Sequence, residues 1–359
     1  MVKIANWLKQ QIANPQVVFL ALVLTAALVT IIYAGGMLAP VLAGIVIAYL
    51  LEGLTAKLTR LKVPRAVAVW LVFLTFILFV AVVVFMLLPT LYNQLTQMVQ
   101  QIPSMLARGQ AALLTLPEKY PDLFSVEQVG EIISSMRSQM TAIGQSIVAS
   151  TLTGAANAIT VMIYMILLPI LIFFFLRDKR RILHWFQELL PRDNARDNEL
   201  AMRVWSDVDA QIGNYIRGKF WEILIVWLVS FVCFTWFGLQ FAMLLSVLVG
   251  LSVLIPYVGA AVVTIPVVLI AWFQWGWSND FAYVVAAYLL IQALDGNLLA
   301  PLLFSEVVNI HPVAIIVAVL FFGGLWGLWG VFFAIPLATL VQAVLVAWPK
   351  SQAPEPEPE

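Results

Sequence analysis

The chain has 359 residues, of which 63% are hydrophobic and 11% are charged, and its formal net charge is zero. A soluble domain carries about 45–50% apolar and about 25% charged residues, so this chain has too little charge to cover a surface that faces water. The composition therefore excludes an ordinary soluble globule and gives no support for a nucleic-acid partner, whereas a mean hydropathy of +0.98 predicts a chain bathed in a lipid bilayer.

The first part of the chain, 1–89, predicts a cytoplasmic N-terminus followed by three transmembrane helices. Runs long enough to cross about 30 Å of hydrocarbon lie at about 16–34, 37–54 and 66–89. We expect a tight turn at Gly35–Gly36 between the first two runs, and an end of the third run near Pro89. Glu52 closes the second run beside Lys57, which indicates a helix end rather than a transport site.

The next part, 90–151, predicts an amphipathic helical subdomain on the extracytoplasmic side. Its apolar side chains recur at helical spacing between Asn, Gln and Thr, as at Leu91, Leu95, Met98, Val99 and Ile102. A helix with such a polar face is typical of a segment outside the hydrocarbon core.

A fourth span is predicted within 152–176, followed by a cytoplasmic amphipathic segment at 177–220. That segment holds nine Lys and Arg and seven Asp and Glu residues. Lys and Arg stay on the cytoplasmic side of short loops. The basic N-terminus and the basic loop 55–65 are therefore placed inside as well, with two predicted spans between them.

The C-terminal part, 221–349, predicts a transmembrane bundle that can be threaded as four spans, or as fewer with a re-entrant hairpin. The candidates for structural breaks or gates are Pro256, Gly259, Gly296, Pro301, Gly323, Gly327 and Pro336. The tail 350–359 alternates Pro and Glu and is predicted to be disordered. The whole chain is thus expected to be an all-α polytopic membrane protein with about eight transmembrane helices.

Asp295 is the outstanding candidate for transport chemistry. A carboxylate at membrane depth costs about 2.5 kcal/mol or more, and it usually faces a cavity or a partner. Gln292 and Asn297 are expected to be its hydrogen-bonding neighbours, and Gly296 and Pro301 are expected to unwind the helix around it. The alternative is a helix end in the headgroup region, where water satisfies the carboxylate.

Other acidic residues of the C-terminal half carry weaker signals. Glu222 follows Lys219 closely, so the pair is expected to anchor the chain at the membrane surface. Glu306 is a further ion-binding candidate in the turn before His311. Only Lys350 follows Lys219, so the sequence offers this half no buried cation to neutralise an acid.

No signature of an enzyme, cofactor or metal site is present. The chain has two His and one Cys, which leaves too few residues for a metal centre or a nucleophilic constellation. It also lacks a phosphate-binding P-loop, so active transport would have to draw on an ion gradient.

Several segments together resemble the autoinducer-2 exporter family of permeases, in order and over nearly the whole chain. They are Leu38–Pro40, Ala48–Glu52, Phe173–Lys179, Asn214–Lys219, Gly250–Gly259, Gln292–Pro301 and Phe322–Gly330. The resemblance implies about eight spans, both termini in the cytoplasm, a bacterial inner membrane and a homo-oligomer, with a pentamer as one form. Members of that family are described as exporters of a quorum-sensing furanone, as sodium–proton antiporters or as permeases.

The function expected from sequence is a permease or secondary transporter that exports a small solute or exchanges a cation for protons through Asp295. Two alternatives stay open at this point. One is a membrane scaffold or envelope-assembly protein that moves nothing, because the two polar segments are large enough to bind partners. The other is a passive oligomeric channel.

Overall fold

The computed structural model describes residues 15–115, 125, 127–131, 133–135, 138–139, 158–188, 195–256, 258–304 and 311–347. Every regular element in these residues is a helix. The chain forms two compact units, one made of 1–46 with 308–359 and the other of 47–307.

Six helices in the described part of the chain are long and apolar enough to cross a membrane: Leu38–Arg60, Arg65–Ala111, Asp209–Trp236, Val258–Trp275, Asn279–Phe304 and Val313–Thr339. Helix α7 (Ala158–Glu188) carries the apolar run of the predicted fourth span. These helices confirm the predicted all-α polytopic membrane fold, and their number agrees with a total of about eight.

Helix α2 runs without interruption from Pro15 to Arg60, so the tight turn predicted at Gly35–Gly36 is wrong. A glycine weakens a helix by only about 1 kcal/mol. A backbone N–H or C=O group that loses its helical hydrogen bond in lipid costs several kcal/mol. The two apolar runs at its ends therefore belong to one helix, with Pro40 inside it.

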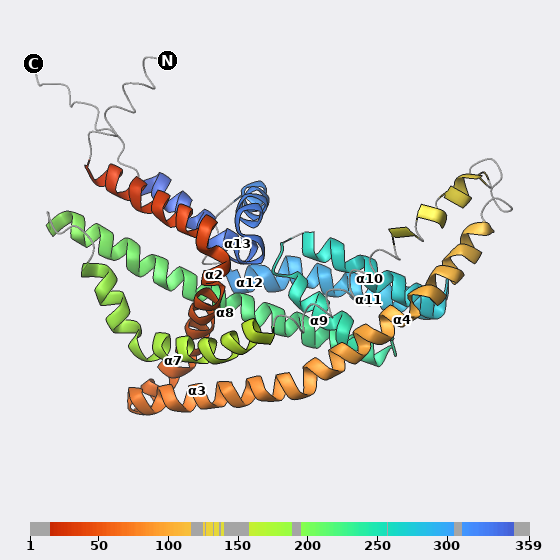
Figure 1. The fold of residues 1–359 in the computed structure, drawn as a ribbon, viewed down its shortest axis with the longest axis horizontal. Helices are drawn as coiled ribbons and strands as arrows, with labels where there is room; N and C mark the ends of the chain where they lie inside the picture. Colours follow the sequence, from red (N-terminus) through yellow and green to blue (C-terminus); the bar gives the residue numbers. More distant parts are fainter. Residues whose placement is uncertain are drawn as a thin grey trace, which may run out of the picture. The chain divides into compact units, whose positions relative to one another are not determined.

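The third span also continues beyond its predicted end. Helix α3 (Arg65–Val82) passes through the π-helical segment η1 (Val83–Leu87) into α4 (Leu88–Leu114), with Pro89 in the first turn of α4. Figure 1 shows the three segments as one continuous helix. A π turn is wider than an α turn, so it accommodates the proline ring without breaking the helix. The first helix of the predicted insertion is thus the direct extension of a transmembrane helix.

A second π segment stands where the helix around Asp295 was expected to unwind. Helix α11 (Asn279–Leu294) continues through η2 (Asp295–Leu299) into α12 (Ala300–Phe304). The Ala300 N–H bonds to the Asp295 carbonyl across the wide turn, so the helix widens here instead of unwinding. As in η1, the π segment ends two residues before a proline, here Pro301. The prediction that Gly296 and Pro301 unwind the helix is therefore wrong.

The break predicted at Pro256 is present. Helix α9 (Ala242–Ser252) has 11 residues and is followed, after a turn at 253–256, by α10 (Val258–Trp275). Eleven residues span about 16 Å, roughly half the hydrocarbon thickness. An added Cβ on Gly259 would lie 1.8 Å from the Ser252 carbonyl oxygen, so only glycine permits this close turn. We call α9 and α10 together the short hairpin.

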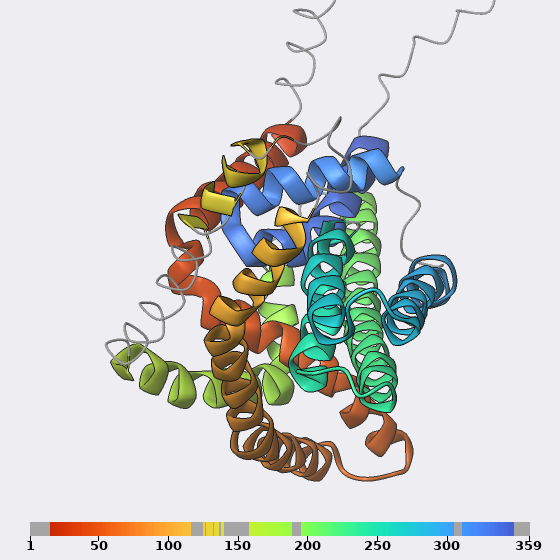
Figure 2. The same ribbon diagram turned by 90° about the vertical axis from the view of Figure 1, so that its right-hand side faces the viewer.

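Helix α8 (Ala195–Trp236) is the element around which the larger unit packs. It lies against α9, α11 and α12, and the short hairpin lies against α11, as Figures 1 and 2 show. The buried core of this bundle includes Phe234, Leu245, Val267 and Tyr288. A smaller core joins α2, α3 and α7 through Leu51, Val69, Val72, Ile172 and Leu176.

In the other unit, α13 (Pro312–Ala347) doubles back on itself at Gly327, whose φ of 58° and ψ of −136° are not helical. An added Cβ on Gly330 would lie 1.8 Å from the Phe322 carbonyl oxygen, and one on Gly323 would lie 2.8 Å from Val331 Cγ2. Residues eight apart in a straight helix would be about 12 Å apart. The glycine cluster therefore forms a tight helical hairpin, with Pro336 in its second arm.

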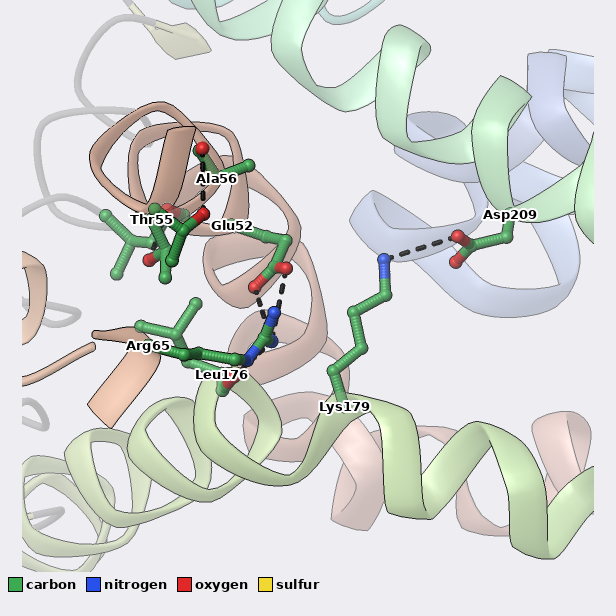
Figure 3. Close-up of polar contacts among 9 residues, drawn as sticks. Glu52, Thr55, Ala56, Arg65, Leu176, Lys179 and Asp209 are labelled. Carbon is green, nitrogen blue, oxygen red and sulfur yellow. Dashed lines mark hydrogen bonds and ion pairs between the residues drawn. The ribbon is translucent and has the colours of Figure 1, made fainter. Parts of the chain in front are cut away.

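Polar side chains join four helices at one end of the smaller core, and we call this set the junction (Figure 3). Arg65 pairs with Glu52 at 3.2 Å and donates to the Leu176 carbonyl at 3.3 Å. Lys179 pairs with Asp209 at 3.2 Å, and Asp209 also accepts a hydrogen bond from the Tyr49 hydroxyl.

The junction corrects the expectation for Glu52. Helix α2 continues to Arg60, and Glu52 is bound to Arg65 of α3 rather than placed beside Lys57. The Lys179 ammonium also lies 4.6 Å from the centre of the Tyr49 ring. The contact residues of α2, Tyr49 and Glu52, are three positions apart, and so are Leu176 and Lys179 of α7. Residues at this spacing lie on one face of a helix. The contacts therefore hold one face of α2 and one face of α7 against α3 and α8.

The close turn of the short hairpin gives a first prediction. Gly259→Ala should lower the free energy of unfolding by about 1–3 kcal/mol, because its methyl group overlaps a carbonyl that cannot move away. Gly109→Ala is the matched control, since an added Cβ there meets nothing within 4 Å. Thermal unfolding in detergent, followed by tryptophan fluorescence, measures both. Equal melting temperatures for the two variants would contradict the close packing.

The junction gives a second prediction, which a charge swap tests. Lys179→Glu and Asp209→Lys should each lower stability by about 1–3 kcal/mol, because each places like charges in contact. The combined swap should recover most of the loss, since it restores an ion pair in reversed order. Arg180→Glu, at an exposed position on the same helix, is the control. A double variant as unstable as the sum of the single variants would rule out a direct pair.

Candidate functional site

A buried ion pair lies inside a membrane-spanning segment of α8. Lys219 Nζ is 2.7 Å from Glu222 Oε2, and the two side chains are only 5% and 4% exposed. They stand one helical turn apart, between Asp209 and Trp236. The pair is thus packed inside the protein, and the expectation that it anchors the chain at the membrane surface stays a prediction.

Aromatic rings and a close helix crossing shield the ion pair. The Lys219 ammonium is 5.4 Å from the centre of the Phe304 ring, and this ring packs at 5.7 Å against the buried ring of Tyr215. An added Cβ on Gly218 would lie 2.9 Å from Phe304, so the glycine lets α12 approach α8. Withdrawing two ions from water costs several kcal/mol each, which a direct pair offsets only when its geometry is good.

Asp295 belongs to the same charged group. It is the first residue of η2, which contacts α8, and its carboxylate interacts electrostatically with both Glu222 and Lys219. Its Oδ1 atom is buried and has no hydrogen-bond partner among the described residues. Lys219 is thus a buried cation beside this half of the chain, where the sequence predicts none. We call Lys219, Glu222 and Asp295 the charged site.

The two amides expected beside Asp295 bind elsewhere. Gln292 Nε2 donates to the Tyr288 hydroxyl at 2.9 Å, and Asn297 Nδ2 donates to the Ala293 carbonyl at 2.8 Å. The Tyr288 hydroxyl is also 2.9 Å from Thr264 Oγ1 of α10. Gln292 therefore links α11 to the short hairpin instead of holding Asp295, and the expected direct bonds to the carboxylate are absent.

The other candidates are spread over the chain. Glu306 lies outside the described residues. Pro256 and Gly259 form the turn of the short hairpin, and Gly296 and Pro301 lie on either side of Asn297 in η2 and α12. Gly323, Gly327 and Pro336 belong to the hairpin of α13 in the other unit.

The chemistry that the charged site can perform is ion binding. The charged site holds two carboxylates and one ammonium, so one negative charge is left over when all three groups are ionised. Within the described residues, no group of three or more His, Cys, Asp or Glu side chains is placed to hold a metal ion.

The sequence contains one signal for a buried ion pair and one for an interfacial pair. Lys219 and Glu222 are separated by three residues, the spacing at which helical side chains meet. The apolar run that follows them indicated an interface at its start. What buries them is the ring of Phe304, which comes from a different helix far along the chain.

Comparisons with known proteins agree with the motifs. The family described as AI-2E family transporter matches residues 17–350. "Putative permease PerM" of Escherichia coli (strain K12) is 43% identical over 347 residues, which cover 97% of this chain and 97% of that protein.

More distant relatives cover most of the chain as well. "AI-2 transport protein TqsA" of Escherichia coli (strain K12) is 25% identical over 313 residues, 87% of this chain and 86% of that protein. "Putative transport protein YueF" of Bacillus subtilis (strain 168) is 25% identical over 301 residues, 83% of this chain and 80% of that protein. The chain is a multi-pass membrane protein that belongs to the AI-2E family of transporters.

Proposed function

We propose that this transporter is a gradient-coupled permease of the bacterial inner membrane, and that Asp295 of the charged site takes up the coupling proton or cation. The observation that carries the proposal is the buried Asp295 Oδ1 atom, which has no hydrogen-bond partner in the described residues. An ionised carboxylate in that position is unstable unless a positive charge joins it. The ammonium beside it is already bound to Glu222 at 2.7 Å.

Competition for one carboxylate gives a coupling mechanism. A proton or a monovalent cation can neutralise Asp295, but both cannot occupy it together. Binding of one therefore weakens binding of the other by the same factor. A transporter that reorients only with Asp295 neutralised would exchange the cation for a proton across the membrane.

Export of a small solute is the second candidate function. Its support is the relative named as an AI-2 transport protein, which is 25% identical to this chain over most of its length. In that case the proton or cation bound at Asp295 would drive solute movement. Solute-dependent dissipation of an imposed gradient distinguishes this mode from simple cation–proton exchange.

The remaining parts of the proposal concern topology and assembly. Lys3 and Lys9 support a cytoplasmic N-terminus, and Arg60 and Lys62 support a cytoplasmic turn between α2 and α3. We place the part of the insertion beyond α4 on the extracytoplasmic side. A homo-oligomer, with a pentamer as one form, follows from the family resemblance.

The coupling role of Asp295 gives the third prediction. In proteoliposomes with imposed pH or sodium gradients, Asp295→Asn should reduce gradient-coupled flux to the level of empty vesicles, because an amide cannot exchange a proton for a cation. Asp280→Asn is the matched control, at an exposed position in the first turn of the same helix, and it should retain flux. Undiminished coupled flux in Asp295→Asn would refute the coupling role. Steady flux without any coupling in the wild type would favour a passive channel, and no flux at all would favour a scaffold.

The ion pair gives the fourth prediction, which separates stability from transport. Lys219→Met should lower the free energy of unfolding by about 3–5 kcal/mol, because it leaves Glu222 buried without its counter-charge. Lys219→Met combined with Glu222→Leu should recover that stability, since apolar side chains of similar volume then replace the buried pair. The stable double variant should still have altered coupling, because Lys219 and Glu222, the charges that act on Asp295, have been removed. A double variant with normal coupled flux would show that the pair is structural only.

A further inference from the structure

Helix α9 of the short hairpin begins without a cap of its own. Its N-cap residue is Phe241, which has a left-handed φ of 58° and makes no side-chain cap hydrogen bond. The first N–H groups of a helix have no partner within the helix, and a local Ser, Thr, Asp or Asn usually accepts from one of them. The apolar sequence of α9 offers no such residue at this position.

A side chain from a distant helix caps α9 instead. The Leu244 N–H donates to Gln94 Oε1 of α4 at 2.9 Å, across a sequence separation of 150 residues. Gln94 stands among apolar neighbours on the face of α4 that packs against the core of the bundle: Leu91, Leu95, Met98 and Met105. The amide is therefore held in place by packing on both sides along the helix.

The end of the short hairpin away from its turn, where α9 begins and α10 ends, is held by further hydrogen bonds. Arg108 of α4 donates to the Phe273 carbonyl near the end of α10 at 3.0 Å. Gln274 Oε1 accepts from the Gln240 N–H at 2.8 Å, and Gln274 Nε2 donates to the Gly238 carbonyl at 2.8 Å. Helix α4 thus contacts both the start of α9 and the end of α10.

The same hairpin packs directly against the elements of the charged site. An added Cβ on Gly250 of α9 would lie 3.0 Å from the carbonyl oxygen of Ile223, the neighbour of Glu222. On the other side, Thr264 of α10 contacts Tyr288, which accepts from Gln292, one turn before Asp295. A displacement of the hairpin would therefore disturb both α8 and α11 at the site.

We propose that Gln94 is a positioning residue for transport: by capping α9 from α4, it fixes the short hairpin against the charged site. Because α4 continues the third span into the insertion, the cap also links the insertion to the short hairpin and, through it, to the helices that carry the charged site. The inference rests on the proposed function, since it names the residue that holds the surroundings of the same site. It is independent of which ion or solute is carried.

A graded series of variants tests the cap. Gln94→Glu keeps an oxygen acceptor and places a negative charge at a helix N-terminus, which favours capping. Gln94→Met keeps the length and packing of the side chain but removes the acceptor. Gln97→Met is the matched control, at an exposed position one turn along α4.

The measurements are amide hydrogen exchange over residues 242–252 in nanodiscs and gradient-coupled flux in proteoliposomes. Gln94→Met should make the first amides of α9 exchange about fivefold to tenfold faster and should lower coupled flux. Gln94→Glu and Gln97→Met should stay close to the wild type in both measurements. This order separates a cap from simple packing, because packing alone would favour Met over Glu.

Two outcomes would overturn the inference. Equal exchange of the α9 amides in Gln94→Met and wild type would show that the hydrogen bond does not hold the helix. Faster exchange with unchanged coupled flux would show that the cap does not position the site. If the wild type itself shows no coupled flux in the same vesicles, the proposed function fails, and the exchange data still decide whether Gln94 caps α9.

Discussion

The constraint on which this structure depends is that lipid offers the backbone no hydrogen-bond partner. An unpaired N–H or C=O in hydrocarbon costs several kcal/mol, more than the weakening caused by a glycine or the strain caused by a proline. Helices therefore persist where local sequence suggests a break. Helix α2 continues through Gly35–Gly36, and the helices that contain Pro89 and Pro301 pass into wide π turns just before each proline. The break at Pro256 differs, because Gly259 lets the two helices meet closely enough to complete a tight turn.

The same constraint organises the charged side chains. Charged side chains of the larger unit are paired either within one helix, as Lys219 with Glu222, or between helices far apart in sequence, as Lys179 with Asp209. Helix α8 carries two such groups, Asp209 in the junction and Lys219 with Glu222 in the charged site. Since one continuous helix holds both, a shift of α8 at the junction would be transmitted to the charged site. Asp295 stands out because one of its oxygen atoms is left without such a partner.

The sequence predicted what depends on composition and on local chemistry. The membrane class, the apolar runs and the turn at Pro256 all follow from residues close together in the chain. The proposal for Asp295 rests on the same kind of local signal, an acid within an apolar run. The motifs also indicated the family, which the comparisons confirm over residues 17–350. What could not be predicted depends on contacts between distant helices. Phe304 turns the Lys219–Glu222 pair from a surface feature into a buried one, and Gln94 caps a helix 150 residues away. Proximity in sequence predicts that the amides of Gln292 and Asn297 bind Asp295, whereas they donate to the Tyr288 hydroxyl and the Ala293 carbonyl.

The central claim is that a proton and a monovalent cation compete for the carboxylate of Asp295. Infrared difference spectroscopy of the purified protein in lipid, recorded on addition of sodium at constant pH, observes this exchange directly. The claim predicts the loss of a protonated carboxyl band in the wild type and no such change in the variant that carries an amide at 295. An identical difference spectrum from both proteins, or a wild-type spectrum without any carboxyl change for sodium, lithium or potassium, would contradict it.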